Sequence, residues 1–374
     1  MTNNNSTYKR LGDYIEQRRE KNKGFDVPIR GVSREGFIPP IQQDADVSLY
    51  NVFYKHDFVF NPARMELNSI ALNEELEQGI CSSLYEIFYI KDTNVLDPLY
   101  LNLLIKTDHF TRFCEFVGWG SVREYCRFAD ISEYYIEVPS IEEQHKVVRH
   151  YNAIRERIAN NKQTIAKLEE AAQALYRKMF VDDVDVENLP DGWRMGTISD
   201  FGEIITGKTP STLDESNFGN DVPFVTIPDM HNVVFVKKTE RALSIKGANS
   251  QKNKTIPENS ICVSCIGTPG LVIINKQPIQ TNQQINSVVL KNPNTLYYCY
   301  FALNSLKQII AEYGMGAAVL NNLNKEEFSK LQILIPDNDS LNEYTEKVSS
   351  MFDLLYQTQQ ENKKLTEMLS VVMA

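Results

Sequence analysis

Two long stretches of the chain carry apolar residues at intervals of seven, which is the pattern of a coiled-coil helix. In residues 140–180 the two rows are Ile158, Ile165, Ala172, Met179 and Ile154, Asn161, Leu168, Leu175. In residues 337–374 the two rows are Val348, Leu355, Asn362, Leu369 and Met351, Thr358, Leu365, Val372. Each stretch of about 40 residues predicts a helix roughly 60 Å long, at 1.5 Å per residue. Polar residues inside the rows lower stability but penalise slipped registers, so the two helices are expected to pair with each other.

The two halves of the chain match when they are laid over each other with an offset of 197 residues. In each half a set of apolar positions ends at a proline just before the long helix. The offset carries the first set onto the second, that is, Ile131, Ile136, Val138 and Pro139 onto Phe328, Ile333, Ile335 and Pro336. It also carries each heptad row onto its counterpart. The sequence therefore predicts an internal duplication in which a globular part and a long helix occur twice.

Short β-like runs precede each long helix. They are residues 50–62, 83–90, 222–227, 260–267 and 285–291. A stretch with helical periodicity closes each block, at residues 97–117 and 295–314. Residues 181–193 are acidic and contain the turn signal Pro190-Asp191-Gly192, so they are interpreted as a linker.

These patterns predict an α+β protein with two mixed α/β domains separated by a pair of long, antiparallel coiled-coil helices. The expected boundaries are residues 1–139, 140–180, 181–336 (with the linker 181–193) and 337–374. Two similar domains held apart by paired helices are suited to a ligand with two half-sites at a fixed separation.

Composition narrows the possible partners. The formal net charge is -10, from 39 Lys and Arg against 49 Asp and Glu, which taken alone argues against nucleic acid. No apolar run approaches the roughly 20 residues that cross a bilayer, and the polar start lacks a signal-peptide core, so a cytoplasmic protein without membrane contact is expected. The 6 cysteines are scattered without a framework spacing and are interpreted as buried thiols.

Positive charge is nevertheless concentrated in two stretches. The first comprises Arg18, Arg19, Lys21, Lys23, Arg30 and Arg34, and the second Lys237, Lys238, Arg241, Lys246, Lys252 and Lys254. Such patches are often plain solvated surface, so by themselves they only permit DNA binding.

Three motifs imitate catalytic or metal sites. Gly202–Thr209 fits the phosphate-loop pattern G-x-x-x-x-G-K-[ST], but Pro210 follows it directly where a helix is required. Asn61-Pro62 lacks the second proline and the aromatic residue of an adenine methyltransferase motif, and it is interpreted as a turn at a strand end. Cys262 and Cys265 have no second pair of ligands for zinc and fit alternating strand positions better. No catalytic residues and no metal site are predicted.

Several longer motifs, each weak alone, together carry a family resemblance. In the first half they are KHDFVFNPARMELNSIAL (55–72) and VPSIEEQHKVVRHYNAI (138–154). In the second half they are DGWRMGTISDFGEIITGKTPS (191–211), VPFVTIPDM (222–230), IPENSICVSCIGTPGLVII (256–274) and TNQQINSVV (281–289). In these motifs, and over nearly its whole length, the chain resembles the specificity subunits of type I restriction-modification enzymes.

The resemblance implies two target-recognition domains and two helical spacers in a non-catalytic subunit that binds a bipartite double-stranded DNA site. It also implies two methyltransferase subunits and restriction motor-nuclease subunits as partners. No cofactor is expected in this chain, whereas S-adenosylmethionine, Mg and ATP are expected in the partner subunits.

The candidate DNA contacts combine the charged stretches with this resemblance. Phosphate contacts are expected from Lys208, Thr209, Ser211, Lys237, Lys238, Lys252 and Lys254. Base contacts are expected from amide and guanidinium groups near Ser33, Arg34, Asn282, Gln283 and Gln284. Further candidates are Arg18, Arg19, Lys21, Lys23, Arg30, Arg64 and Arg241.

Other functions remain open from the sequence. One is an enzyme, either an adenine methyltransferase or a phosphate-loop ATPase, although no cofactor site is complete. Another is a coiled-coil scaffold that binds only protein, which the acidic balance favours. A third is a specificity subunit that serves a fused methyltransferase-nuclease.

Overall fold

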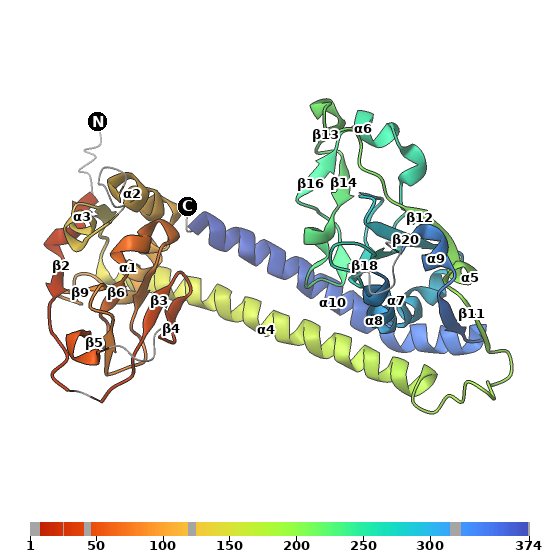
Figure 1. Ribbon diagram of the computed structural model, residues 1–374, viewed down its shortest axis with the longest axis horizontal. Helices are drawn as coiled ribbons and strands as arrows, with labels where there is room; N and C mark the ends of the chain where they lie inside the picture. The colour runs from red at the N-terminus through yellow and green to blue at the C-terminus, as the bar shows by residue number, and fades with distance from the viewer. Residues whose placement is uncertain (1–7, 25, 41–45, 119–124, 315–322, 373–374) are drawn as a thin grey trace. The chain divides into compact units, whose positions relative to one another are not determined.

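The computed structural model describes residues 8–24, 26–40, 46–118, 125–314 and 323–372 of the 374-residue chain. The chain divides into two compact units. Unit 1 comprises Met1–Ile158 and Lys364–Ala374, and unit 2 comprises Ala159–Lys363. The long helices α4 (Ile141–Phe180) and α10 (Asn338–Val372) both run from one unit into the other (Figure 1).

Unit 1 is built on a four-stranded antiparallel sheet. Its strand order is β2 (Ile15–Arg18), β9 (Glu86–Ile90), β6 (Phe58–Phe60), β7 (Ile70–Leu72). Three strand pairs accompany it: β1 (Tyr8–Arg10) with β10 (Tyr135–Glu137), β3 (Gly31–Ser33) with β4 (Gly36–Ile38), and β5 (Asn51–Tyr54) with β8 (Gln78–Cys81). The helices of this unit are η1 (Leu11–Asp13), η2 (Val47–Leu49), η3 (Pro62–Leu67), α1 (Pro98–Ile105), α2 (Asp108–Gly118) and α3 (Phe128–Ser132).

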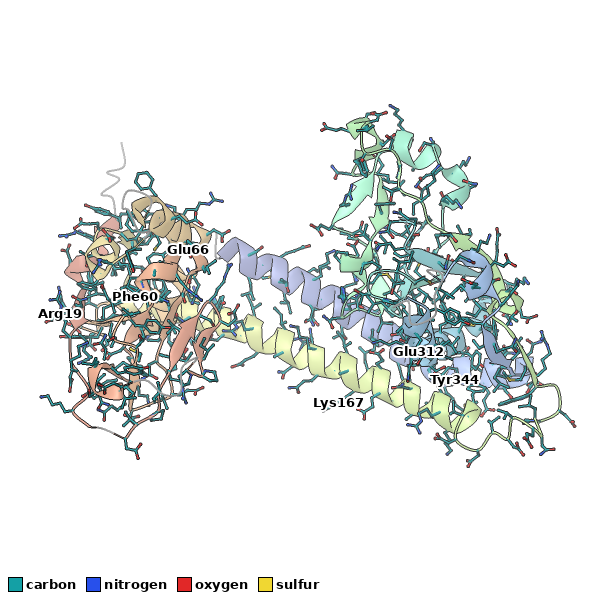
Figure 2. The ribbon with its side chains drawn as sticks, viewed as in Figure 1. Arg19, Phe60, Glu66, Lys167, Glu312 and Tyr344 are labelled. Atoms are coloured by element: carbon teal, nitrogen blue, oxygen red, sulfur yellow. The ribbon has the colours of Figure 1, made fainter. Side chains whose placement is uncertain are left out.

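The core of unit 1 is aromatic. Phe58, Phe60 and Phe88 are fully buried, and the rings of Phe58 and Phe88 stack with centroids 4.9 Å apart. Figure 2 labels Phe60 within this unit. The predicted run 50–62 contributes to the core of this unit, but a turn at His56, with φ of 67°, divides that run into β5 and β6.

The helical stretch 97–117 is not one helix but two. The first helix ends at Ile105, and Thr107 caps the start of the second, because its hydroxyl accepts a hydrogen bond from the Phe110 amide at 3.2 Å. Such a capping bond satisfies an amide that the helix itself cannot pair. The corresponding stretch 295–314 is likewise divided, into α7 (Leu296–Ser305) and α8 (Lys307–Gly314).

Unit 2 contains two larger sheets. One has the order β12 (Gly202–Thr206), β20 (Ile285–Leu290), β17 (Ile261–Ser264), β18 (Val272–Asn275), β15 (Phe235–Val236). The other has the order β13 (Phe218–Gly219), β16 (Arg241–Leu243), β14 (Val222–Val225), β19 (Gln280–Thr281). A separate pair joins β11 (Arg194–Thr197) to β21 (Gln332–Ile335). The short helices are α5 (Ile198–Phe201), η4 (Glu215–Asn217), η5 (Ile227–Met230), α6 (Ile245–Asn249), η6 (Lys252–Lys254), η7 (Pro293–Thr295) and α9 (Lys325–Ser329).

Within unit 2 the two long helices run antiparallel, as predicted. The amide of Asn161 donates to Glu361 at 3.0 Å, and the hydroxyl of Tyr344 donates to the Ala172 carbonyl at 3.0 Å. Asn161 and Thr358 are buried in this contact, and Asn362, the third predicted polar seam position, is half-buried. The side chain of Val372, another predicted seam residue, lies outside the described residues.

The helices have a second apolar face that the heptad rows did not include. Tyr176, Phe180, Tyr344 and Phe352 are buried and pack with Tyr298 of α7 in one hydrophobic cluster. Large aromatic side chains bury much apolar surface and dominate such contacts. In unit 2 the paired helices are therefore fused to the globular part by a shared core.

Three elements recur at the offset of 197 residues on which the predicted repeat rests. Adding 197 to the bounds of α3 gives those of α9, and the same offset carries β10 onto β21 and the first residue of α4 onto that of α10. Turns occupy the predicted linker 181–193, and the Trp193 indole at its end donates to Asp337 at 2.5 Å, just before α10.

Candidate nucleic-acid interface

A groove of about 840 Å³ in unit 2 gathers three of the predicted phosphate contacts. Lys237 and Lys238 follow β15, Lys252 lies in η6, and all three side chains are exposed. Asp221 is the one carboxylate among the lining residues, and its Oδ2 already accepts the Ile245 amide at 3.0 Å. The groove therefore has a positive lining even though the chain as a whole is acidic.

The chain after β15 is held by local hydrogen bonds that fix the backbone carrying the lysines. The Thr239 hydroxyl accepts the Phe224 amide at 3.2 Å and donates to the Arg241 carbonyl at 2.5 Å. The Gln277 amide donates to the Lys237 carbonyl. Arg241 itself lies over the Phe218 ring, 4.7 Å from its centroid, and does not line the groove.

The loop that resembles a phosphate loop has a different structure. Gly207 donates its amide to the Ile285 carbonyl at 3.1 Å, and Lys208 donates its amide to the Thr281 carbonyl at 2.9 Å. Amides that are paired in this way are not available to cradle a phosphate. Residues 207–211 also lead into a turn rather than a helix, so the sequence-based rejection of a nucleotide site agrees with the geometry.

Gly207 lies very close to the neighbouring chain. A Cβ at this position would lie 2.1 Å from the Asn282 carbonyl oxygen and 2.2 Å from Thr281 Oγ1. The loop 207–211 therefore packs directly on residues 281–284, two segments that the sequence analysis treated separately. The Thr209 hydroxyl completes the contact through a hydrogen bond of 2.8 Å with the side-chain amide of Gln283.

Gln251 connects this loop to the basic 3-10 helix η6, and sequence reasoning missed it. Its side chain is 3% exposed, and its amide donates to the Lys208 carbonyl at 2.6 Å and to Gln280 Oε1 at 2.9 Å. A buried glutamine next to a run of lysines carries no sequence signal of such a role. Its position shows that Lys208 and Lys252 belong to one connected surface.

The remaining candidates of unit 2 are spread around this surface. Ser211 is exposed and its carbonyl accepts the Asn217 amide at 3.0 Å. Lys254 is half-buried at the end of η6 and does not line the groove.

In unit 1 the candidate Arg18 is engaged in the fold. Its guanidinium donates to both oxygens of Asp57, at 2.6 and 3.0 Å, and lies between the rings of Tyr54 and Tyr89. Asp57 is 1% exposed, and burial raises the pKa of its carboxyl although Arg18 opposes that shift. A buried carboxylate needs such a partner, so Arg18 has a structural role, and 24% of its side chain remains exposed for another contact.

The other candidates of unit 1 lie mostly at the surface. Arg19, Lys21, Lys23, Arg34 and Arg64 are exposed, Arg30 is half-buried, and Ser33 bonds to Glu35 within the β3–β4 turn at 3.0 Å. Arg34 is the only one of them that lines the cavity of about 490 Å³ beside the first turns of α4, among the residues that the structure describes. In that cavity Lys106 donates to the Arg34 and Ile70 carbonyls, and burial lowers its pKa to about 8.

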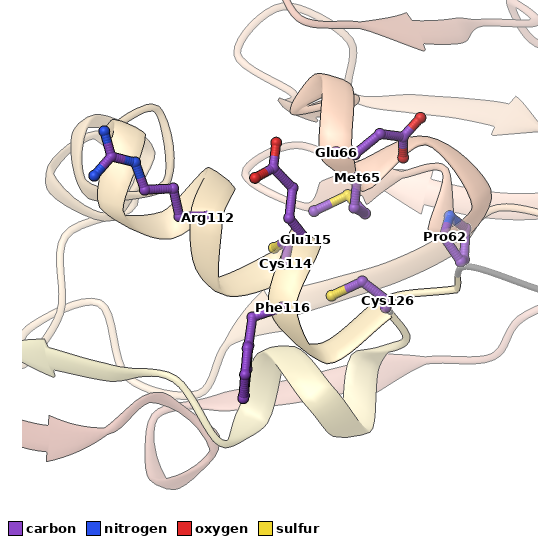
Figure 3. A pocket seen from close by; sticks show the side chains of 9 residues that line it. Pro62, Met65, Glu66, Arg112, Cys114, Glu115, Phe116 and Cys126 are labelled. Carbon is purple, nitrogen blue, oxygen red and sulfur yellow. The ribbon is translucent and has the colours of Figure 1, made fainter. Parts of the chain in front are cut away.

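A third cavity, of about 380 Å³, lies between η3 and α2 (Figure 3). Pro62, Met65 and the thiols of Cys114 and Cys126 line it together with the carboxylates of Glu66 and Glu115. Arg112 also lines the cavity, but the two carboxylates outnumber its guanidinium, so the lining does not favour a phosphate. Asn61 accepts the Ala63 amide at 3.1 Å and caps η3, so the Asn61-Pro62 motif is a turn after β6, as interpreted from the sequence.

The cysteines are buried and free, as predicted. Burial raises the pKa of Cys262 to about 12 and that of Cys265 to about 11. Within the described ranges no cluster of three or more metal-ligating side chains is present. Among the same residues no helix is long and apolar enough to cross a membrane.

Comparison with known proteins places these features in a family. Residues 190–369 match the type I restriction modification DNA specificity domain, and this range includes the groove and both loops beside it. The HindI specificity subunit of Haemophilus influenzae, a type I restriction enzyme subunit, is 28% identical over 81% of each chain. Residues 190–369 therefore carry a type I restriction modification DNA specificity domain, and the chain is similar to a type I specificity subunit over most of its length.

Two further relatives are consistent with this family. The MjaIX specificity subunit of Methanocaldococcus jannaschii, a type I restriction enzyme subunit, is 24% identical over 49% of this chain and 43% of the relative. The type I restriction-modification S subunit of M. genitalium has the same fold, with a TM-score of 0.61 at 14% identity, over 100% of this chain and 97% of that one. The chain therefore shares its fold with that S subunit.

Proposed function

We propose that this chain recognises a bipartite DNA sequence and directs adenine methylation or restriction by partner subunits. The observation that carries this proposal is the groove with Lys237, Lys238 and Lys252, which lies inside the range matched by the DNA specificity domain. Three ammonium groups on one concave surface suit a phosphate backbone, whereas a protein-only scaffold gives no reason for them to converge. The recognition domains are residues 1–139 and 181–336, and the helical spacers are residues 140–180 and 337–374.

Within the second domain the phosphate contacts are assigned to the lysines of the groove, to Lys254, and to Lys208, Thr209 and Ser211 on the adjoining loop. Asn282, Gln283 and Gln284 are assigned to base edges, because amides pair with bases in the major groove. Arg241 is a further contact at the edge of this surface. In the first domain the contacts are assigned to Arg18, Arg19, Lys21, Lys23, Arg30, Ser33, Arg34 and Arg64.

The chain acts as a recognition subunit, not as an enzyme. Two methyltransferase subunits and the restriction subunits supply the chemistry, and S-adenosylmethionine, Mg and ATP bind to those partners. The assembly works in the cytoplasm, where its DNA is found. The helices α4 and α10 set the separation of the two half-sites, because a helix of 40 residues such as α4 spans roughly 60 Å.

The test is methylome sequencing of cells that express the partner methyltransferase subunit with and without this chain. We expect N6-methyladenine in a motif of two short half-sites separated by a fixed number of unspecified bases, only when the chain is present. A matched chain with Lys237→Ala and Lys252→Ala should methylate fewer sites of the same motif. Identical methylation with and without the chain, while the complex still forms, would contradict the proposal and favour a scaffold.

A further inference from the structure

The segment between β19 and β20 carries three consecutive amide side chains, and hydrogen bonds fix the orientation of one of them. The backbone N–H of Gln284 lies 3.1 Å from the side-chain amide of Asn282. Because a backbone N–H only donates, the atom that faces it is the Asn282 oxygen. The Asn282 nitrogen therefore points the other way.

This orientation determines what Gln284 presents. The Asn282 nitrogen lies 2.8 Å from the side-chain amide of Gln284 and donates to it, so the Gln284 atom in this contact is its oxygen. The Gln284 side chain is half-buried, and its Nε2 takes part in none of the hydrogen bonds among the described residues. Its amide thus has an occupied acceptor and an available donor.

The donor Nε2 of Gln284 is not enclosed, since the fully buried side-chain atoms without a hydrogen-bond partner among the described residues do not include it. Gly267, in the loop between β17 and β18, has a φ of 82°, and a Cβ at this position would lie 3.0 Å from Gln284 Nε2. A side chain here would cover the amide nitrogen, so the glycine keeps it accessible. The Asn282–Gln284 segment also contacts the loop 207–211 through Thr209, and that loop joins the lysine groove through Gln251.

From this geometry we infer that Gln284 is a specificity-determining residue that donates to a base and reads a hydrogen-bond acceptor, with guanine as the preferred base. The inference rests on the proposed function. A glutamine that reads adenine uses its oxygen and its nitrogen together, and here the oxygen is already taken by Asn282. Guanine presents two acceptors, N7 and O6, in the major groove, so it fits a group that only donates.

Gln283 carries no such assignment. Its amide contacts the Thr209 hydroxyl, 2.8 Å away, and a hydroxyl donates or accepts with equal ease. The Gln283 amide is therefore fixed in neither orientation.

The test is selection of bound duplexes from a randomised DNA library by the full chain and by a Gln284→Glu variant. The variant replaces a donor by an acceptor of the same size. We expect wild type to select guanine at one position, and the variant to prefer cytosine or adenine there, with about a tenfold change in preference at that position. All other positions of both half-sites should be unchanged.

Asn282→Asp tests the same position without altering Gln284. An aspartate accepts at both oxygens, so the Gln284 amide turns its nitrogen inward and its oxygen outward, and the preference should change at the same base. Gln308→Glu, on the exposed surface of α8, is the matched control that adds the same charge, and it should leave every preference intact.

The outcomes separate this inference from the proposed function. A wild-type chain that selects a bipartite motif, with Gln284→Glu and Asn282→Asp selecting the same bases as wild type, would overturn the role of Gln284 alone. Thermal unfolding of both variants at the wild-type Tm establishes that a change in selection is not a loss of fold. A wild-type chain that selects no sequence would overturn the proposed function and this assignment with it.

Discussion

The groove lysines give the most direct test of DNA binding, and the perturbation is the double substitution Lys237→Ala with Lys252→Ala. The two lysines come from different elements, the segment after β15 and the 3-10 helix η6, yet line one groove. Both are exposed, and neither ammonium has a hydrogen-bond or ion-pair partner among the described residues. Their removal should therefore change the surface charge without disturbing the core.

The expected magnitude follows from counterion release. Each phosphate that a cation neutralises adds about 0.9 to the slope of the logarithm of affinity against the logarithm of salt concentration. Two lost contacts should flatten that slope by about 1.8. Between 50 and 200 mM salt the wild-type chain should consequently lose about tenfold more affinity than the double variant does.

The assay is fluorescence anisotropy with a labelled duplex of random sequence and a duplex that contains the selected motif. Affinity should fall for both duplexes alike, because phosphate contacts carry no sequence information. The matched control is Lys162→Ala with Lys167→Ala, which removes the same charge from exposed positions on α4; Figure 2 labels Lys167.

An unchanged salt slope in the groove variant would refute the assignment of these lysines to phosphates. An equal loss of slope in the α4 control would show that net charge, and not the groove, sets the affinity. Only a loss confined to the groove variant supports the reasoning.

Three other substitutions test separate contacts. In Gly207→Ala the added Cβ would lie 2.1 Å from a backbone oxygen, so the loop should shift, and library selection should show weaker base preferences while binding at low salt persists. Asp200→Asn removes a carboxyl whose pKa is lowered from 3.8 to about 2 by a hydrogen bond from Arg194. The ionised carboxyl should stabilise the fold at neutral pH, and this stabilisation should vanish as the pH falls towards 2. The measurement is the difference in Tm between wild type and variant across that pH range. Tyr344→Phe removes the buried hydroxyl that donates to the Ala172 carbonyl, and urea unfolding should show a loss of about 1 kcal/mol; an unchanged midpoint would mean that this bond adds nothing to the helix pair.

The long helices were predictable because their signal is local and repeated. Asn161 and Thr358 are polar residues in a heptad seam, and both are buried where the pattern placed them. Phe180 and Tyr344 were not predicted as core residues, because they lie outside the rows and are buried together with Tyr298 of α7 in the core of unit 2. A heptad pattern identifies the helix face that packs on the partner helix. A second buried face depends on how the globular part of the chain folds against the helix, and the heptad pattern does not contain that information.

The hydrophobic periodicity also does not predict the helix breaks at Thr107 and Leu306. Both helical stretches keep an apolar face across the break, so the pattern continues while the backbone does not. At Thr107 a side-chain cap competes with the helix for the Phe110 amide, which is a local event of one hydrogen bond. Summed periodicity over twenty residues is insensitive to such an event.

The candidate interface shows which part of a charged surface a sequence reveals. The excess of lysine and arginine between residues 237 and 254 is a local property that the sequence shows directly. The fold decides which of these side chains line the groove: Lys237 and Lys252 do, whereas Arg241 stacks on Phe218. The connection of this stretch to the loop 207–211 passes through Gln251, which is buried and uncharged and whose partners lie about 30 to 40 residues away in the chain. Base-reading geometry is set by bonds of this kind, because an amide that is free to rotate offers a donor and an acceptor equally, and only a fixed neighbour decides which one the DNA meets.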